Sequence, residues 1–236
     1  MRIRIINPVV RGVLDEAALP SMPQFVEVEV DWLDEGPSSI ECRYDEALCV
    51  PPVLERVRQA AAAGVDGIVV NCFMDPALQP AREIVRVPVA GPGQSSMALA
   101  ITLGQTFSVI LPAASGAPIV VDQAVAYVGR DRLASVRSVE MPVADLHDRD
   151  RLLEALVEQA RLAVEQDGAQ VVVLGCTGMC GVTAAFKQNV AQLGLGVPVI
   201  DPTLAAIAAV VAQFVTAVAH GERAYALPSW RTLEVA

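Results

Sequence analysis

Short apolar runs alternate along the chain with longer stretches of helical periodicity. Strand-like runs occupy residues 2–6, 25–30, 67–71, 87–90, 107–111, 135–140, 171–174 and 197–200. Helical patterns occupy residues 53–63, 76–85, 117–127, 150–166, 182–192 and 204–219. The first helix is expected to start after Pro51-Pro52, because proline interrupts a helix interior, and residues from Pro228 onward predict a tail. This alternation predicts parallel strands joined by right-handed helical crossovers.

One segment of the first half is repeated in the second. Gly64 is followed eight residues later by Cys72, and Gly168 by Cys176, in both cases through an apolar strand-like run. Further along, 87–92 (VPVAGP) is echoed by 197–202 (VPVIDP). A repeat on this scale predicts two similar units. We therefore expect an α/β fold of two pseudo-symmetric lobes, each a parallel sheet flanked by helices, with the active site between the lobes.

The last long helix is expected to pack back on the first lobe. Lobe one is then discontinuous, with residues 1–95 plus 204–236, and lobe two comprises residues 96–203.

Composition and charge exclude several classes of protein. Hydrophobic residues make up 53% of the chain and aromatic residues only 4%, so the core consists of small aliphatic side chains, as suits helices packed on parallel sheets. A net charge of -10 disfavours nucleic-acid binding. The longest apolar stretch, about 15 residues from Leu204 to Val218, is too short to span a bilayer comfortably, and no signal peptide is recognisable. We expect a cytoplasmic protein without membrane partners.

Five cysteines with wide spacings predict neither disulfides nor a metal site. Their number is odd, the expected compartment is reducing, and the chain has only two histidines. Cys42, Cys49 and Cys180 are interpreted as small apolar residues, as free cysteines usually are.

Cys72 and Cys176 are the candidate catalytic residues. Each follows a buried strand directly and precedes a helix, at the sheet edge where α/β folds bind ligands. Backbone N–H groups in such turns can bind an anion and lower the pKa of a thiol. Two thiols that meet between the lobes can move a proton from one face of a carbon to the other. The alternative is a relic of duplication in which one thiol is idle.

Neighbouring residues are candidates for binding a substrate. Asn7 follows the first strand, although a turn-forming Asn before Pro8 is an equal alternative. Gly93 and Ser95 follow another strand and offer donors or simply turn the chain. Thr177 supplies a hydroxyl, and Gly178 allows close approach to the backbone. Asp75 is expected to cap the helix that follows it, with orientation of Cys72 as the alternative.

Several motifs carry a resemblance to a known family. They are 5–8 (IINP), 36–40 (GPSSI), 44–47 (YDEA), 71–73 (NCF), 75–76 (DP), 174–179 (LGCTGM) and 197–202 (VPVIDP). The chain resembles the Asp/Glu/hydantoin racemase superfamily, and most closely its hydantoin and allantoin racemase branch. The resemblance extends over about residues 1–220.

The resemblance implies a racemase that needs no cofactor. Cys72 and Cys176 would act as base and acid, exchanging roles with substrate handedness. By the same match, Asn71 and the backbone around Phe73, Met74, Thr177 and Gly178 would bind a small-molecule substrate through its carbonyl or carboxylate group. A hydantoin-like ring or an amino-acid derivative is the implied substrate, and a homo-oligomer the implied assembly.

Three residues depart from the family pattern and leave other functions open. Val9 and Val10 replace polar residues and are expected to add an apolar wall, while Met74 is expected to narrow the site. A related lyase or isomerase is one alternative. Decarboxylases of the arylmalonate type retain only one of the two cysteines, whereas maleate isomerases carry both but are disfavoured by the motifs. A non-catalytic ligand-binding protein of the same fold is the other alternative.

Overall fold

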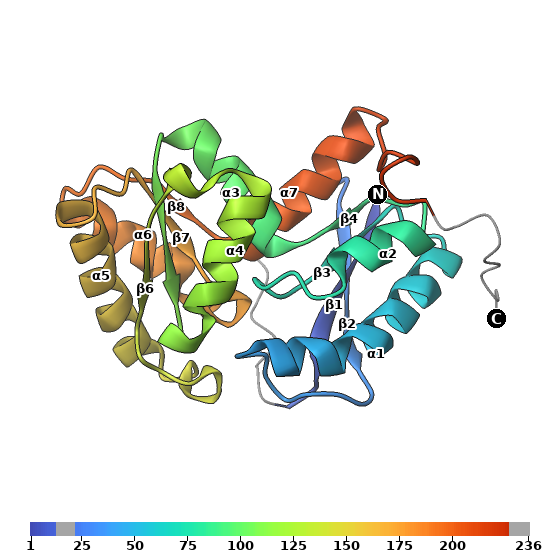
Figure 1. The fold of residues 1–236 in the computed structure, drawn as a ribbon, viewed down its shortest axis with the longest axis horizontal. Helices are drawn as coiled ribbons and strands as arrows, with labels where there is room; N and C mark the ends of the chain where they lie inside the picture. The colour runs from blue at the N-terminus through green and yellow to red at the C-terminus, as the bar shows by residue number, and fades with distance from the viewer. Residues whose placement is uncertain (13–21, 227–236) are drawn as a thin grey trace.

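The structure is a computed structural model that describes residues 1–12 and 22–226 (Figure 1). The described residues form two separate four-stranded parallel sheets, seen side by side in Figure 1. The tail predicted from Pro228 onward lies outside the described residues, as does the end of the predicted lobe one.

The two sheets have equivalent strand orders. The first has the order β2-β1-β3-β4, and its strands are β1 (Arg2–Val10), β2 (Glu27–Leu33), β3 (Gly67–Val70) and β4 (Val89–Ala90). The second has the order β6-β5-β7-β8, with β5 (Phe107–Leu111), β6 (Leu133–Ser138), β7 (Val171–Leu174) and β8 (Val199–Ile200). All pairings are parallel. The predicted pseudo-symmetric α/β fold is confirmed.

Helices cover both faces of each sheet. The helices are α1 (Arg43–Ala62), α2 (Leu78–Ile84), α3 (Pro92–Leu103), α4 (Ala117–Tyr127), α5 (Arg149–Glu165), α6 (Thr183–Gln192) and α7 (Pro202–Val215). Short 3₁₀ turns are η1 (Ala114–Gly116), η2 (Arg130–Arg132), η3 (Val143–Asp145) and η4 (Thr177–Val182). On β3, Ile68 packs with the α1 side and Val69 with the α7 side, because successive strand residues face opposite ways. A strand covered on both faces is apolar throughout, as β3 and β7 are.

The final helix packs against the first sheet. Ile207 and Val210 of α7 lie in one core cluster with Ile3 and Ile5 of β1. Helix α3 contacts both α7 and β7 and lies near the junction of the two halves in Figure 1. The predicted boundary between residues 95 and 96 falls inside α3. The division into lobes remains a prediction.

The predicted start of the first long helix is wrong. Helix α1 begins at Arg43 and continues through Pro51 and Pro52. Cys49 and Val53 lie on its buried face, whereas Pro51 is exposed, together with the residues four positions before each proline, Ala47 and Leu48. The carbonyls that lose their partners can therefore be hydrated. Burial on both sides of the prolines keeps the helix continuous.

Helix α3 replaces the loop or turn expected around Gly91 and Gly93. Pro92 lies in its first turn, a position that proline favours. Other elements keep their predicted type and shift at their ends: β1 extends to Val10, and β2 runs from Glu27 to Leu33. Strand ends are set by pairing with neighbouring strands, which local sequence does not show.

Candidate active site

Cys72 lies in a tight turn after β3. The backbone N–H of Asn71 still donates to Ile6 of β1 at 2.8 Å, and the next N–H, of Cys72, turns back to Val70 at 2.9 Å. The N–H of Asp75 then donates to the carbonyl of Cys72 at 3.0 Å. Cys72 is thus placed at the carboxyl end of the first sheet, as predicted.

Cys176 occupies the equivalent place after β7. Gly175 donates its N–H to Ile110 of β5 at 2.8 Å, and Met179 donates to the carbonyl of Cys176 at 3.1 Å to start η4. A Cβ at residue 175 would lie 2.9 Å from the Ile110 carbonyl oxygen and closer still to Leu111. Glycine therefore allows Cys176 to lie close to β5.

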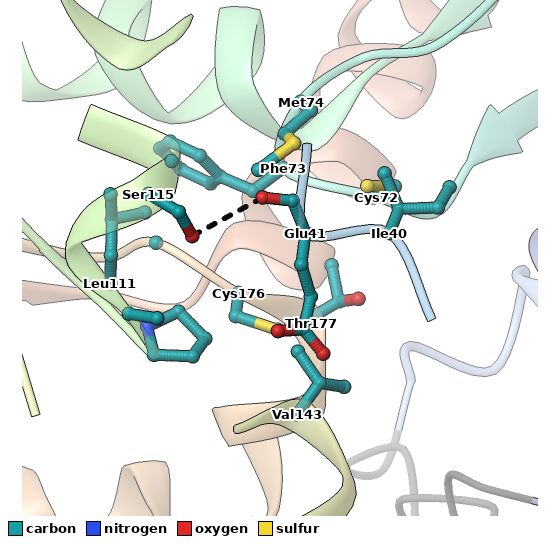
Figure 2. A pocket seen from close by; sticks show the side chains of 14 residues that line it. Ile40, Glu41, Cys72, Phe73, Met74, Leu111, Ser115, Val143, Cys176 and Thr177 are labelled. Carbon is teal, nitrogen blue, oxygen red and sulfur yellow. Dashed lines mark hydrogen bonds between the residues drawn. The ribbon is translucent and has the colours of Figure 1, made fainter. Parts of the chain in front are cut away.

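The two cysteines line a single pocket of about 410 Å³, its open mouth included (Figure 2). From the first sheet and its connections it is lined by Ile40, Glu41, Cys72, Phe73 and Met74. From the second it is lined by Leu111, Pro112, Ala113, Ser115, Gly116, Val143, Gly175, Cys176 and Thr177. The pocket thus lies at the carboxyl ends of strands from both sheets, the usual ligand site of such folds.

Burial raises the pKa of both thiols, contrary to the sequence-based expectation. The pKa of Cys176 rises to about 11, and that of Cys72 rises well above its ordinary value. The expected donors are present, since the backbone N–H groups of Met74 and of Gly178 with Met179 favour the thiolates. Their effect is smaller than the cost of placing a charge in a desolvated pocket. Both groups are thiols at neutral pH in the free protein.

The other predicted binding residues divide into two sets. Phe73, Met74 and Thr177 line the pocket. The Thr177 hydroxyl donates to the backbone carbonyl of Asn71 at 3.2 Å, so its proton is already engaged. The residues that do not line the pocket are Asn7, Asn71, Gly93, Ser95 and Gly178.

Asn7 and Asn71 belong to a polar network behind the pocket. The Asn71 amide donates to Asn7 Oδ1 at 2.8 Å, and Thr203 Oγ1 donates to Asn71 Oδ1 at 2.9 Å. With the Thr177 contact, these bonds tie the Cys72 turn to β1, α7 and the Cys176 turn. The two Asn side chains therefore hold the Cys72 turn, and the Cys176 turn is joined to it through the backbone carbonyl of Asn71.

Gly93 and Asp75 connect the Cys72 turn to the start of α3. Asp75 accepts N–H bonds from Gly93 at 2.9 Å and Gln94 at 2.7 Å, so it caps α3 rather than the helix that follows it. Gln123 of α4 donates to the Phe73 carbonyl at 3.0 Å. Ser95 lies in the first turns of α3, where its N–H donates to the Gly91 carbonyl at 3.0 Å.

The buried Asp75 carboxyl should make stability depend on pH. Burial raises the pKa of Asp75 to about 7, against the opposing N–H donors. Between its unfolded value of about 3.9 and this folded value, the folded protein keeps a proton that the unfolded chain has lost, so rising pH lowers stability. We expect the difference in unfolding free energy between the natural protein and Asp75→Asn to fall by about 1.4 kcal/mol per pH unit from pH 5 to 6, and by about half as much per unit close to pH 7. Urea unfolding measures it, and a pH-independent difference would contradict the expectation.

The departures at Val9 and Val10 do not shape the pocket. Val9 is buried in the first sheet's core with Trp32 and Leu33, and neither valine lines the site. The expectation that these valines add an apolar wall to the site is therefore wrong. Met74 does line the pocket, as expected.

Several lining residues were not anticipated from the sequence. Glu41 directly follows a motif of the family resemblance, Leu111 ends β5, and Pro112 follows it. The convergence of parallel strand ends could have indicated the latter two. Nothing in the local sequence marks Ser115, Gly116 or Val143 as site residues.

The remaining cysteines lie outside the pocket. Cys49 is fully buried in the first core cluster, as expected. Cys180 is half-buried and its thiol donates to Asp201 Oδ1 at 3.2 Å. Cys42 is exposed at the start of α1, so its interpretation as a buried apolar residue is wrong.

Residues 1–12 and 22–226 lack two kinds of feature. No group of three or more His, Cys, Asp or Glu side chains is placed to hold a metal ion there. No helix of the same residues is long and apolar enough to cross a membrane.

Two equivalent α/β halves with one pocket at the strand ends of both sheets define a two-lobed α/β protein with a small-molecule site between its halves. The profile of the Asp/Glu/Hydantoin racemase family matches residues 9–210, so the chain belongs to this family and is an isomerase of the racemase type.

Relatives and solved structures agree with this membership. A hydantoin racemase of Rhizobium meliloti is 35% identical over 212 residues, covering 88% of this chain and 86% of the relative. The structure of an allantoin racemase from Klebsiella pneumoniae is 30% identical, with a TM-score of 0.87 over 99% of this chain and 96% of the other. A mutant arylmalonate decarboxylase shares the fold at 16% identity, with a TM-score of 0.71 over 95% and 96% of the two chains.

Proposed function

We propose that the protein racemises a hydantoin-type ring at the carbon next to a ring carbonyl, with Cys72 and Cys176 as base and acid. The observation that carries this proposal is that both thiols, from equivalent turns of the two sheets, line one pocket. The hydantoin and allantoin racemases among the similar proteins support the substrate class.

The chemistry needs one thiolate and one thiol. The thiolate removes the proton from the ring carbon, and the electron pair moves into the adjacent carbonyl as an enolate. The opposite thiol then donates its proton to the other face, so inversion leaves the two sulfurs with exchanged protonation states. Backbone N–H groups near Met74 and Gly178 favour each sulfur when it is charged. The substrate of opposite handedness runs the same steps in reverse.

The lining of the pocket favours a neutral ring over a free amino acid or a dicarboxylate. Glu41 is the one charged side chain among the described lining residues, so no cationic side chain of this set faces the substrate. A substrate carboxylate would lose its hydration without gaining a counter-ion. Because arylmalonate and maleate are dicarboxylates, the lack of a cationic lining side chain also disfavours activity of the arylmalonate decarboxylase or maleate isomerase type. A non-catalytic binding protein is disfavoured by family membership.

A substrate panel tests the proposal. Racemisation of 5-substituted hydantoins, allantoin, free amino acids and arylmalonates is followed by circular dichroism, with decarboxylation measured in parallel. We expect turnover of the hydantoin ring compounds and none of the others. Turnover confined to amino acids or to arylmalonates would contradict the proposed substrate class.

The rate should rise with pH. Because the pKa of Cys176 is about 11 and that of Cys72 is higher than usual, the thiolate fraction of the free enzyme increases about tenfold per pH unit near neutrality. We expect kcat/KM to rise by on the order of tenfold per unit between pH 7 and 9, after subtraction of the enzyme-free rate. Initial rates of hydantoin racemisation measure it. A profile that stays flat over this range would contradict a thiolate base.

The division into a discontinuous lobe one and a lobe two, the homo-oligomeric assembly and the cytoplasmic location belong to the same proposal. The packing of α7 on the first sheet supports the discontinuity. The assembly rests on the family resemblance and the location on the sequence.

A further inference from the structure

Glu41 is held in place by both of its backbone polar groups. Its N–H donates to Asp45 Oδ2 at 3.0 Å, in the first turn of α1. Its carbonyl accepts from Ser115 Oγ at 3.4 Å, drawn as the dashed line in Figure 2. Since Ser115 belongs to η1, next to the second sheet, Glu41 bridges the two halves across the pocket.

The Glu41 carboxylate faces the pocket. Ser39 Oγ donates to one of its oxygens at 3.1 Å, and no ion pair to Glu41 exists among the described residues. Figure 2 shows the side chain extending toward Cys176 and Thr177, which line the same pocket. The negative charge of Glu41 contributes to the raised pKa of the Cys176 thiol, which agrees with this proximity.

We propose that Glu41 determines substrate specificity by accepting an N–H from the substrate and by repelling any substrate that carries a carboxylate. The inference rests on the proposed racemase function and narrows its substrate class. The protein then accepts neutral or cationic hydantoins that present N–H donors to the Glu41 carboxylate. It rejects hydantoins with an anionic 5-substituent.

The physical basis is the chemistry of an ionised carboxylate in an apolar pocket. An ionised carboxylate accepts hydrogen bonds and donates none, so the second Glu41 oxygen favours an N–H donor. A second negative charge a few ångströms away is repelled more strongly in such a pocket than in water. Specificity therefore arises from repulsion of the wrong substrate as well as attraction of the right one.

Two substrates of nearly equal shape separate the effect of substrate charge from that of substrate size. Hydantoin-5-acetamide and hydantoin-5-acetate have nearly the same shape, but only the second is anionic. We expect the natural protein to favour the acetamide in kcat/KM by at least about tenfold, and Glu41→Gln to reduce this preference at least about fivefold. Glu41→Asp keeps the charge and should keep the preference. Glu154→Gln removes an exposed charge on α5 and should also keep it.

Calorimetric binding of the same two compounds to each variant gives the preference independently of turnover. An unchanged acetamide-to-acetate ratio in Glu41→Gln, including equal losses on both, overturns the specificity role and leaves the racemase proposal intact. If the natural protein racemises no hydantoin at all, both the specificity role of Glu41 and the racemase proposal are overturned.

Discussion

Cys72→Ser and Cys176→Ser are each expected to lower kcat/KM for racemisation by at least about 10³-fold. Serine preserves the shape of the side chain, but its hydroxyl is a far weaker acid than a thiol and cannot supply the base. In the proposed mechanism each thiol is needed in every turnover, as base for one substrate enantiomer and as acid for the other. Circular dichroism and denaturant unfolding of both variants check that the fold is retained.

Cys42→Ser is the matched control for the cysteine series. This thiol is exposed at the start of α1 and does not line the pocket, so kcat/KM should stay within about twofold of the natural value. Undiminished racemisation by either the Cys72 or the Cys176 variant would mean that the thiol in question is idle, as after a duplication that left one copy unused.

Gly93→Ala is expected to cause the second-largest effect. A Cβ at this position would lie 2.2 Å from the Phe73 carbonyl oxygen and 2.9 Å from Asp75 Oδ2. Both neighbours belong to the turn that carries Cys72, and the first is backbone, so the turn itself has to move. We expect a loss of about 2–3 kcal/mol in unfolding free energy and a fall of about 10²-fold in kcat/KM.

Gly221→Ala is the control for this substitution. A Cβ there meets no atom within 4 Å, so the change should leave both stability and activity nearly unaffected. If Gly93→Ala is as active and as stable as the natural protein, the Cys72 turn does not depend on its contact with α3.

The positions of the two cysteines could be predicted because they depend on local sequence. An apolar run of four residues ends in a turn before Cys72 and again before Cys176, and parallel strand ends converge at one edge. The repeat then predicts the same place in both halves, as β3 and β7 show. The parallel pairing of the strands follows from the same alternation of elements, and α7 packs on the first sheet as expected of the last helix.

Features that depend on distant contacts could not be predicted. The start of α3 depends on Asp75, which reaches Gly93 and Gln94 from another loop. Glu41 reaches the pocket because its backbone is held from α1 and from η1. The direction of the thiol pKa shifts depends on how much water the folded chain excludes, which short motifs do not reveal.

In the proposed mechanism, one thiol removes a proton from one face of the substrate and the other thiol donates a proton to the opposite face. The most direct test is racemisation of one pure hydantoin enantiomer in D₂O, with deuterium at the ring carbon measured in each enantiomer during the first few per cent of conversion. A two-thiol enzyme should place solvent deuterium in essentially every product molecule while the remaining substrate keeps its proton. Deuterium appearing equally fast in both enantiomers, or a product that retains the original proton, would contradict the two-thiol account.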